Sequence, residues 1–317
     1  MTWVEELRAR EAVARRAPSA HNTQPWLVVY CSGDGRGEVR IGADPARSLP
    51  GSDATGRDLA LGIGALVESY LIVAAEAGLA VDAVTGPGPA ARLGPAQQVY
   101  ATPFTGADLQ ARQVARGRFA PGPVPSAVLT SLEPGVVHVP GIELAADLAV
   151  ADRWLFATPV VARELRDWLR LHPRHPRYGL DGLTDRALAL SRVEARLLSA
   201  ALRAYPVTRR LGLPALLAAA GRQQLRGDGS VLVLTTVPGE DRVGAGRRLL
   251  RTWLALGRYG FAVHPLSQLI DCPATAAHLA ERVGDGSGGS GGTRPLAVFR
   301  AGRPLAAPAR SARLPPG

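Results

Sequence analysis

The sequence predicts an α+β fold in which one chain holds two similar halves and a helical insertion. The main observation is a repeat: the runs Gly62–Val81 and Gly244–Val263 both read as a long apolar helix, a glycine that ends it, and the start of a strand. Their glycines and closing Ala-Val pairs stay 182 residues apart throughout. Two unrelated helix–glycine–strand units are the simpler alternative. The constant spacing favours a degenerate duplication.

The first part of the chain predicts alternating helices and strands. The charged run Thr2–Arg16 indicates a helix, and the apolar run Leu27–Cys31 indicates a buried strand. A second helix is expected near Gly56–Ala77, followed by a strand after Gly78. The Gly/Pro-rich segment Pro87–Pro95 predicts a loop.

The rest of the chain repeats this alternation after a long helical stretch. In chain order we expect helices over Glu143–Leu171 and Thr184–Arg203, a strand over Val231–Thr236, a helix over Arg242–Arg258, a strand over Phe261–His264, a mobile Gly/Ser loop over Gly284–Gly292 and a strand over Leu296–Arg300.

The repeat divides the chain into a first half, residues 1–106, and a second half, residues 107–317. Residues 184–229 have no counterpart in the first half. Such an insertion is a lid over an active site or an ordinary helical elaboration, and the pattern leaves both open.

Several classes of protein are disfavoured by composition. The N-terminus lacks a basic-then-apolar leader, so a cytoplasmic location is expected. Glu68 and Glu76 interrupt the apolar run Leu59–Val81, which favours a helix buried between two halves over a membrane span. No membrane partner is therefore expected. The two cysteines lack metal-ligand spacing, and no metal site is predicted.

The net charge is +10, and every basic side chain is arginine. Schiff-base and acid–base chemistry on lysine are thereby excluded. A bound phosphate would have to be held by guanidinium groups or backbone amides. A GC-biased genome explains the arginine excess without any function. A basic nucleic-acid-binding module is a further alternative, but the arginines are scattered and no nucleic acid partner is expected.

One segment carries most of the functional information, the run Pro18-Ser19-Ala20-His21-Asn22-Thr23-Gln24-Pro25-Trp26. Its hydroxyl and amide side chains, Ser19, Asn22 and Gln24, can donate and accept hydrogen bonds, as a flat polar heterocycle requires. An ordinary capping turn before a strand is the alternative.

A second segment, Arg112–Phe119, places two arginines four residues apart. Arg112 and Arg116 could reach one anion from the same face of a helical turn or of a following loop. Surface arginines in an arginine-rich chain are the alternative.

Two further segments lie near the C-terminus. The chain is expected to leave the sheet at Pro265, which frees the backbone N–H groups of the next residues, among them Ser267 and Gln268. The tail carries Arg310 and Arg313, which form either a basic pair for an anion or a frayed end.

These segments resemble those of the nitroreductase-like FMN oxidoreductases. The first resembles their P-S-x-x-N-x-Q-P-W segment, most closely in the H-N-T-Q-P-W form of the Acg-like flavoproteins. The second resembles R-R-S/T-x-R, from which Gln113 and Val114 depart. The turn after Pro265 resembles P-I-E-G, and the tail resembles K/R-x-R-L-P. The order of the segments is that of the Acg-like proteins.

The resemblance implies a nitroreductase-like fold in which the first half imitates the partner subunit of the dimeric enzymes. Arg112 and Arg116 would then hold the phosphate or ribityl chain of FMN, with Arg310 and Arg313 returning to the phosphate. Ser267 and Gln268 would present backbone amides to flavin N5, and Ser19, Asn22 and Gln24 would reach the ring across a pseudo-two-fold axis. One FMN per chain is expected, and because the chain imitates a dimer it could act as a monomer; the oligomeric state stays open.

The expected activity is hydride transfer between flavin N5 and a small aromatic, nitro, quinone or heterocyclic substrate, with NADH or NADPH as the transient reductant. No side chain stands out as an obligatory acid or base; Asp152 and Glu164 are interpreted as solvated charges. The rival function is sequestration of FMN under a lid formed by residues 184–229, without turnover.

Overall fold

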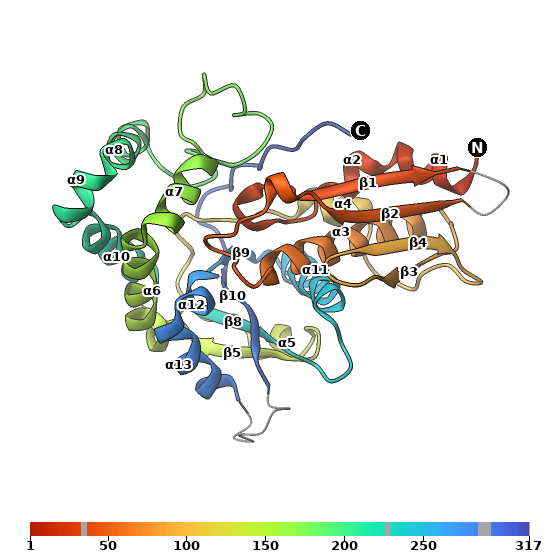
Figure 1. Cartoon of the computed structure of the whole chain (residues 1–317). Coiled ribbons are helices and arrows are strands. Elements are labelled where there is room, and N and C mark those ends of the chain that lie inside the picture. The colour runs from red at the N-terminus through yellow and green to blue at the C-terminus, as the bar shows by residue number, and fades with distance from the viewer. Residues whose placement is uncertain (33–36, 226–228, 285–292, 317) are drawn as a thin grey trace.

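The computed structural model describes residues 1–32, 37–225, 229–284 and 293–316, and these form an α+β protein with two antiparallel four-stranded sheets (Figure 1). The loop predicted over Gly284–Gly292 lies, beyond Gly284, outside the described residues.

The first sheet has the strand order β1-β2-β4-β3, and all neighbours are antiparallel. One face is buried through residues such as Val39 and Leu93, whereas Leu27 and Val29 of the other face are exposed. This is the usual alternation of an antiparallel sheet with one solvated face. The strands are β1 Trp26–Cys31, β2 Glu38–Ala43, β3 Val81–Thr85 and β4 Ala91–Pro95.

The prediction of a loop over Pro87–Pro95 is wrong, because β4 begins at Ala91 and pairs with both β2 and β3. Ala91 and Leu93 are buried and Arg92 between them is exposed, which is the alternation of a strand. The surrounding glycines and prolines hide this pattern in the sequence.

The second sheet has the order β5-β8-β10-β9, also antiparallel throughout. In each sheet the order is thus first, second, fourth and third strand. β8 is buried along its whole length, because helices cover both faces of this sheet. The strands predicted near β8, β9 and β10 are confirmed, and β5 was not predicted. Their bounds are β5 Val136–Pro140, β8 Ser230–Thr235, β9 Ala262–Pro265 and β10 Pro295–Gly302.

Two long helices, α3 (Arg57–Glu76) and α11 (Arg242–Arg258), pack against each other in the centre of the molecule (Figure 1). A Cβ atom on Gly64 would lie 2.0 Å from the carbonyl oxygen of Val243, and one on Gly246 would lie 2.3 Å from that of Leu61. Only glycine permits this close approach. The two contacts are reciprocal, because Gly246 lies 182 residues after Gly64 and Val243 lies 182 residues after Leu61.

In the described part of the chain, α3 alone is long and apolar enough to span a membrane, and 83% of its most apolar stretch is buried inside the protein. The expectation of a buried helix at this place is confirmed. Glu68, which interrupts its apolar run, is fully buried and ion-paired with Arg247 and Arg251 of α11.

The N-terminal helix predicted over Thr2–Arg16 is interrupted at Arg10, whose φ of −99° and ψ of 3° are not helical. The chain forms α1 (Trp3–Ala9) and α2 (Glu11–Ala14), then the 3₁₀ turn η1 (Ala20–Asn22) before β1.

The middle of the chain is helical but more broken than predicted. The helix expected over Glu143–Leu171 ends at Ala157, because Pro159 cannot continue it, and a new helix starts there. The helix expected from Thr184 begins only at Arg192. Elements here are η3 Gly141–Leu144, α6 Ala145–Ala157, α7 Pro159–Trp168, β6 Leu169–Arg170, β7 Leu183–Thr184, α8 Arg192–Arg203, α9 Tyr205–Arg210 and α10 Leu213–Gln223.

Helices α6, α12 and α13 cover the second face of the second sheet, and α10 packs on α6 from outside. The insertion therefore lies at one end of the molecule, away from the first sheet (Figure 1). The remaining elements are η2 Pro45–Arg47, α4 Gly106–Ala111, α5 Ser126–Leu129, α12 Gln268–Asp271 and α13 Pro273–Val283.

Candidate functional site

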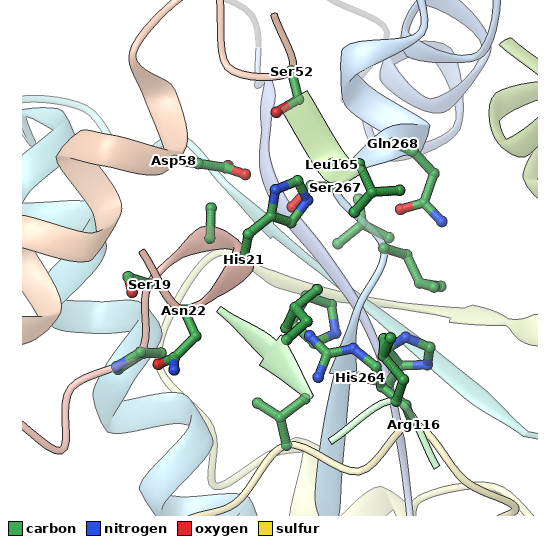
Figure 2. A pocket seen from close by; sticks show the side chains of 18 of the residues that line it. Ser19, His21, Asn22, Ser52, Asp58, Arg116, Leu165, His264, Ser267 and Gln268 are labelled. Carbon is green, nitrogen blue, oxygen red and sulfur yellow. The ribbon is translucent and has the colours of Figure 1, made fainter. Parts of the chain in front are cut away.

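A cavity of about 430 Å³ lies where segments from the whole chain converge. Its volume falls in the range of small-molecule and cofactor sites. Figure 2 shows Ser19, His21 and Asn22 on one side, with Gln268, Arg116 and His264 on the other. Its wall comes from the η1 turn, the N-terminal end of α3, residues 112–116, the segment after β9, the insertion and the C-terminal tail.

The η1 turn is strained. His21, Asn22 and Gln24 have φ angles of 46°, 55° and 53°, in the left-handed region. Such conformations cost non-glycine residues about 1–3 kcal/mol each and persist where surrounding contacts enforce them. Ser19 contributes one such contact, because its Oγ accepts a hydrogen bond from the Gln24 N–H at 2.9 Å.

Contacts with distant segments hold this turn. Asn22 Nδ2 donates to the carbonyls of Gly182 and Ala312, at 3.2 and 3.1 Å. Gln24 Nε2 donates to the Leu180 carbonyl at 2.9 Å, and its Oε1 accepts from the Leu314 N–H at 2.8 Å. The second half thus satisfies both amides, through main-chain groups and, for Asn22 Oδ1, through the Arg313 guanidinium. Asn22 still lines the cavity, whereas Gln24 does not.

Three arginines, Arg16, Arg112 and Arg313, form what we call the open cluster. Arg112 Nη2 donates to the Arg16 carbonyl at 2.7 Å, and Arg313 donates to the carbonyls of Arg15, Arg16 and Ala17 at 2.7 to 3.0 Å. Within the described ranges no carboxylate lies within ion-pair distance of the three. Arg16 Nε and Arg112 Nε and Nη1 are buried without a hydrogen-bond partner there.

The electrostatics of the open cluster are unfavourable without a ligand. Burial, together with the neighbouring charge of Arg16, lowers the pKa of Arg112 to about 9. Burial lowers the pKa of Arg313 well below its ordinary value, and the charges of Arg16 and Arg112 contribute to the same shift. Buried charges normally have a counter-charge. The cluster is therefore suited to a polyvalent anion that accepts several charge-assisted hydrogen bonds.

Arg116 lies apart from the open cluster. Helix α4 ends at Ala111, and the next residues are extended, with the Ala115 N–H donating to the Val263 carbonyl at 2.9 Å. The two predicted arginines thus lie on a loop, not on a helical turn. Arg116 Nη1 donates to the Ala187 carbonyl at 3.3 Å, and burial lowers its pKa to about 10.

The two residues that depart from the R-R-S/T-x-R pattern, Gln113 and Val114, have different surroundings in the structure. Val114 bridges to Val263 and packs into the apolar cluster beneath α11. Gln113 lines the cavity and has a buried Oε1 without a partner among the described residues. The segment thus offers an unused acceptor beside the arginines.

Two histidines also line the cavity. His264 Nδ1 accepts a hydrogen bond from Arg300 Nε at 3.1 Å, so that Nε2 carries the proton of the neutral ring. Burial lowers its pKa well below 6.5, and Arg116 and Arg300 lower it further. Burial likewise lowers the pKa of His21 to about 4, and its Nδ1 has no partner in the described chain. Both rings are neutral at pH 7.

Gln268 meets a buried carboxyl group. Its Nε2 donates to Asp152 Oδ1 at 2.9 Å, and burial raises the pKa of Asp152 to about 6. A Cβ on Gly221 would lie 1.9 Å from Asp152 Oδ2, so α10 covers this carboxyl. The interpretation of Asp152 as a solvated charge is wrong, because the insertion that buries it is distant in sequence. Glu164 is not free either, since it accepts hydrogen bonds from Gly51 and Ser52.

The structure brings most of the predicted site residues together. The cavity is lined by Ser19, Asn22, Arg112, Arg116, Ser267, Gln268 and Arg313. Gln24 lies behind the turn, and Arg310 is exposed and donates to the Gln110 carbonyl.

Other polar and aromatic lining residues were not among the predicted cofactor residues. They include Arg16, His21, Gln113, Asp152, Trp253 and His264. Arg16 and His21 stand beside or inside the Pro18–Trp26 segment, and that position was the signal available for them. No sequence pattern marks Trp253, which lies within an apolar helix.

The insertion supplies an apolar wall of this cavity. Leu188, Leu190, Leu198 and Leu217 line it. Polar groups of the η1 turn and of residues 112–116 line the same cavity. The lining therefore offers both charged groups for an anion and an apolar surface for a flat ring.

Comparison with known proteins adds no relative to this description: no protein-family model matches the chain, and no curated protein matches it significantly.

Proposed function

We propose that the protein is an FMN-dependent oxidoreductase with a nitroreductase-like fold, in which one chain imitates a dimer. The observation that carries the proposal is the open cluster: buried N–H groups without partners, and no carboxylate within reach in the described chain, in the wall of a cavity of cofactor size. A phosphate supplies both the missing charge and the missing acceptors.

The residues present fit the rest of the cofactor. Arg16, Arg112 and Arg313 would hold the phosphate, while Gln113 Oε1 would accept from the ribityl hydroxyls. Arg116 and the protonated Nε2 of His264 are donors for ring oxygens. Bound FMN supplies hydride transfer at its N5 atom.

The remaining lining groups orient a substrate and manage its proton. Trp253 and the leucines of the insertion exclude water and provide an apolar surface for a small aromatic, nitro, quinone or heterocyclic molecule. Asp152 is able to hold a proton on its carboxyl group at mildly acidic pH and can release it to such a molecule. NADH or NADPH would serve as reductant.

The arrangement of the chain supports a single-chain pseudo-dimer. Both sheets have the same strand order and directions, and α3 and α11 meet through reciprocal glycine contacts. The η1 turn of residues 1–106 is held by residues 180–182 and 312–314 of the rest. The open cluster combines Arg16 of residues 1–106 with Arg112 and Arg313 of residues 107–317, so both parts of one chain build a single site, which supports one FMN per chain and a monomer.

Titration of the flavin-free full chain with FMN tests the proposal. We expect quenching of flavin fluorescence that saturates at one FMN per chain. A chain that binds no FMN contradicts the cofactor assignment, and two FMN per chain contradict the pseudo-dimer argument alone.

Sequestration of FMN without turnover is a second candidate, because the insertion contributes several leucines to the cavity wall and buries Asp152. Anaerobic addition of NADPH or NADH to the FMN-loaded protein separates the two functions. Bleaching of the flavin absorbance supports the oxidoreductase, and flavin that stays oxidised with both reductants supports sequestration.

A further inference from the structure

The outer surface of helices α8, α9 and α10 exposes large aliphatic side chains. These helices form the edge of the molecule beyond α6 and α7, away from both sheets (Figure 1). We call this surface the outer face. Its aliphatic members and their exposed fractions are Val193 63%, Leu197 66%, Val207 59%, Leu211 80% and Leu216 69%.

Helix α8 shows that this exposure is not a by-product of core packing. Ala195 and Leu202 are buried, and Leu198, on the same side, lines the cavity. Val193 and Leu197 point the other way, one helical turn apart. The helix therefore presents a second apolar stripe, whose two members are each about two-thirds exposed.

The outer face is also strongly basic. Between Ser191 and Leu225 the sequence has one acidic residue, Glu194, whose carboxylate caps the first turn of α8. In the same span six arginines are exposed: Arg192, Arg196, Arg203, Arg209, Arg210 and Arg222. Within the described residues no carboxylate lies within ion-pair distance of any of them.

We propose that the outer face docks onto an anionic lipid surface. Amphipathic helices with basic and aliphatic side chains lie in the plane of a membrane, with the aliphatic groups at the boundary between headgroups and acyl chains. Clusters of four to eight basic residues bind anionic lipid headgroups. Here arginines alternate with exposed leucine and valine along α8 and α9, so both requirements are met at one surface.

This partner explains the whole surface better than a nucleic acid does. Phosphate backbones would engage the arginines, but they offer nothing to Leu197 or Leu211. Docking of this kind also differs from the membrane span that the sequence disfavours in α3, because α8 and α9 would lie on the membrane surface without crossing the membrane.

The docking has a consequence for the substrate, which rests on the proposed function. The helices that form the outer face also line the cavity, through Leu198 of α8 and Leu217 of α10. A membrane-bound orientation places this apolar wall next to the lipid phase. Among the proposed substrate classes it favours quinones that partition into membranes.

Sedimentation with lipid vesicles tests the proposal. The full chain, with or without FMN, is mixed at 150 mM salt with vesicles of phosphatidylcholine alone or with one third phosphatidylglycerol. We expect most of the protein to pellet with the anionic vesicles and at least tenfold weaker binding to phosphatidylcholine.

Two double variants divide the contributions. Leu197→Ser with Leu211→Ser, and Arg196→Glu with Arg203→Glu, should each weaken binding at least tenfold. The matched controls lie on the first sheet: Val84→Ser, at a side chain exposed to 66%, and Arg40→Glu with Arg92→Glu, whose side chains are about two-thirds exposed. All variants lie at exposed positions, and circular dichroism checks that each is folded.

Three results would overturn the proposal: no binding to anionic vesicles, equal loss in the control variants, or retention on duplex DNA that is unaffected by the leucine substitutions. Vesicle binding by a chain that takes up no FMN would refute the proposed function and leave the docking surface standing.

Discussion

Two arginine clusters contact the η1 turn and the residue after it, and only one of them contains a carboxylate within the described residues. In the closed cluster, Arg47, Arg170 and Arg177 surround the fully buried carboxylate of Asp181, with Arg47 Nη2 at 2.6 Å and Arg170 Nη2 at 3.0 Å from its oxygens. Arg47 also donates to the Thr23 carbonyl at 2.6 Å. The open cluster binds the turn through Arg313 Nη1, which donates to Asn22 Oδ1 at 2.8 Å.

The difference separates structure from function among side chains of one type. Burial raises the pKa of Asp181, but hydrogen bonds from Arg177, Arg47 and Arg170 outweigh it and hold the pKa below its ordinary value. This cluster is complete and contributes to the fold. The open cluster costs stability in the free protein, because its charges are buried without a counter-charge. A ligand that supplies the charge completes it.

The largest expected effect comes from opening the closed cluster. Asp181→Asn keeps the shape but leaves three arginines without a counter-charge, and loss of one partner from a buried ion network costs about 3–5 kcal/mol. Chemical denaturation measures this change. Glu143→Gln, which breaks the exposed pair with Arg282, should cost about 1 kcal/mol or less. Equal losses in the two variants would mean that burial does not make the Asp181 network more important for stability than an exposed ion pair.

The second effect is stabilisation of the open cluster by its ligand. At one hundred times its dissociation constant, FMN should raise the free energy of unfolding by about 2.7 kcal/mol. Riboflavin at the same concentration should give a much smaller rise, because it lacks the phosphate. Thermal unfolding with each flavin measures the difference. Identical shifts would show that the open cluster does not bind the phosphate.

The third effect is a loss of FMN affinity without a loss of stability, when an arginine of the open cluster is removed. Arg112→Ala removes charged hydrogen bonds worth about 1.5–3 kcal/mol, so FMN should bind about ten- to hundredfold more weakly. The unfolding free energy without FMN should stay constant or rise, since a buried unpaired charge is removed. Arg118→Ala, an exposed arginine on the same loop, is the control. If both variants lose affinity alike, the phosphate site lies elsewhere.

The smallest effect concerns pH. His21 lies near Arg116, Glu164 and Asp58, and its folded pKa of about 4 is below its unfolded value. Protons therefore bind the unfolded state more strongly between pH 6.5 and 4, so stability falls as pH falls through this window. Between pH 6.5 and 5 the loss from His21 is about 1–2 kcal/mol.

His21→Asn should reduce that loss, because asparagine tolerates the left-handed backbone and does not titrate. Urea denaturation at several pH values measures it, with exposed His172→Asn as the control. An unchanged pH slope in His21→Asn would show that this ring is not held neutral by the fold.

The sequence by itself predicted the elements whose patterns are local. The apolar runs of β8, β9 and β10, the helices α3 and α11 with their closing glycines, and the α+β class are confirmed. Seven of the nine predicted cofactor residues line one cavity, because three of the motifs lie at element ends that meet there. The assignment of that cavity to FMN stays a prediction.

Tertiary structure decided what local pattern does not encode. Gln24 lies in the predicted motif, yet its amide faces Leu180 and Leu314, and Asp152 is buried only because Gly221 of the insertion packs on it. β4 is a strand because two neighbours pair with it. Whether an arginine is neutralised by Asp181 or left open to a ligand depends on which distant carboxylate the fold brings near. Hydrogen bonds and charge pairs act over a few ångströms in space, and separation along the chain does not determine that distance.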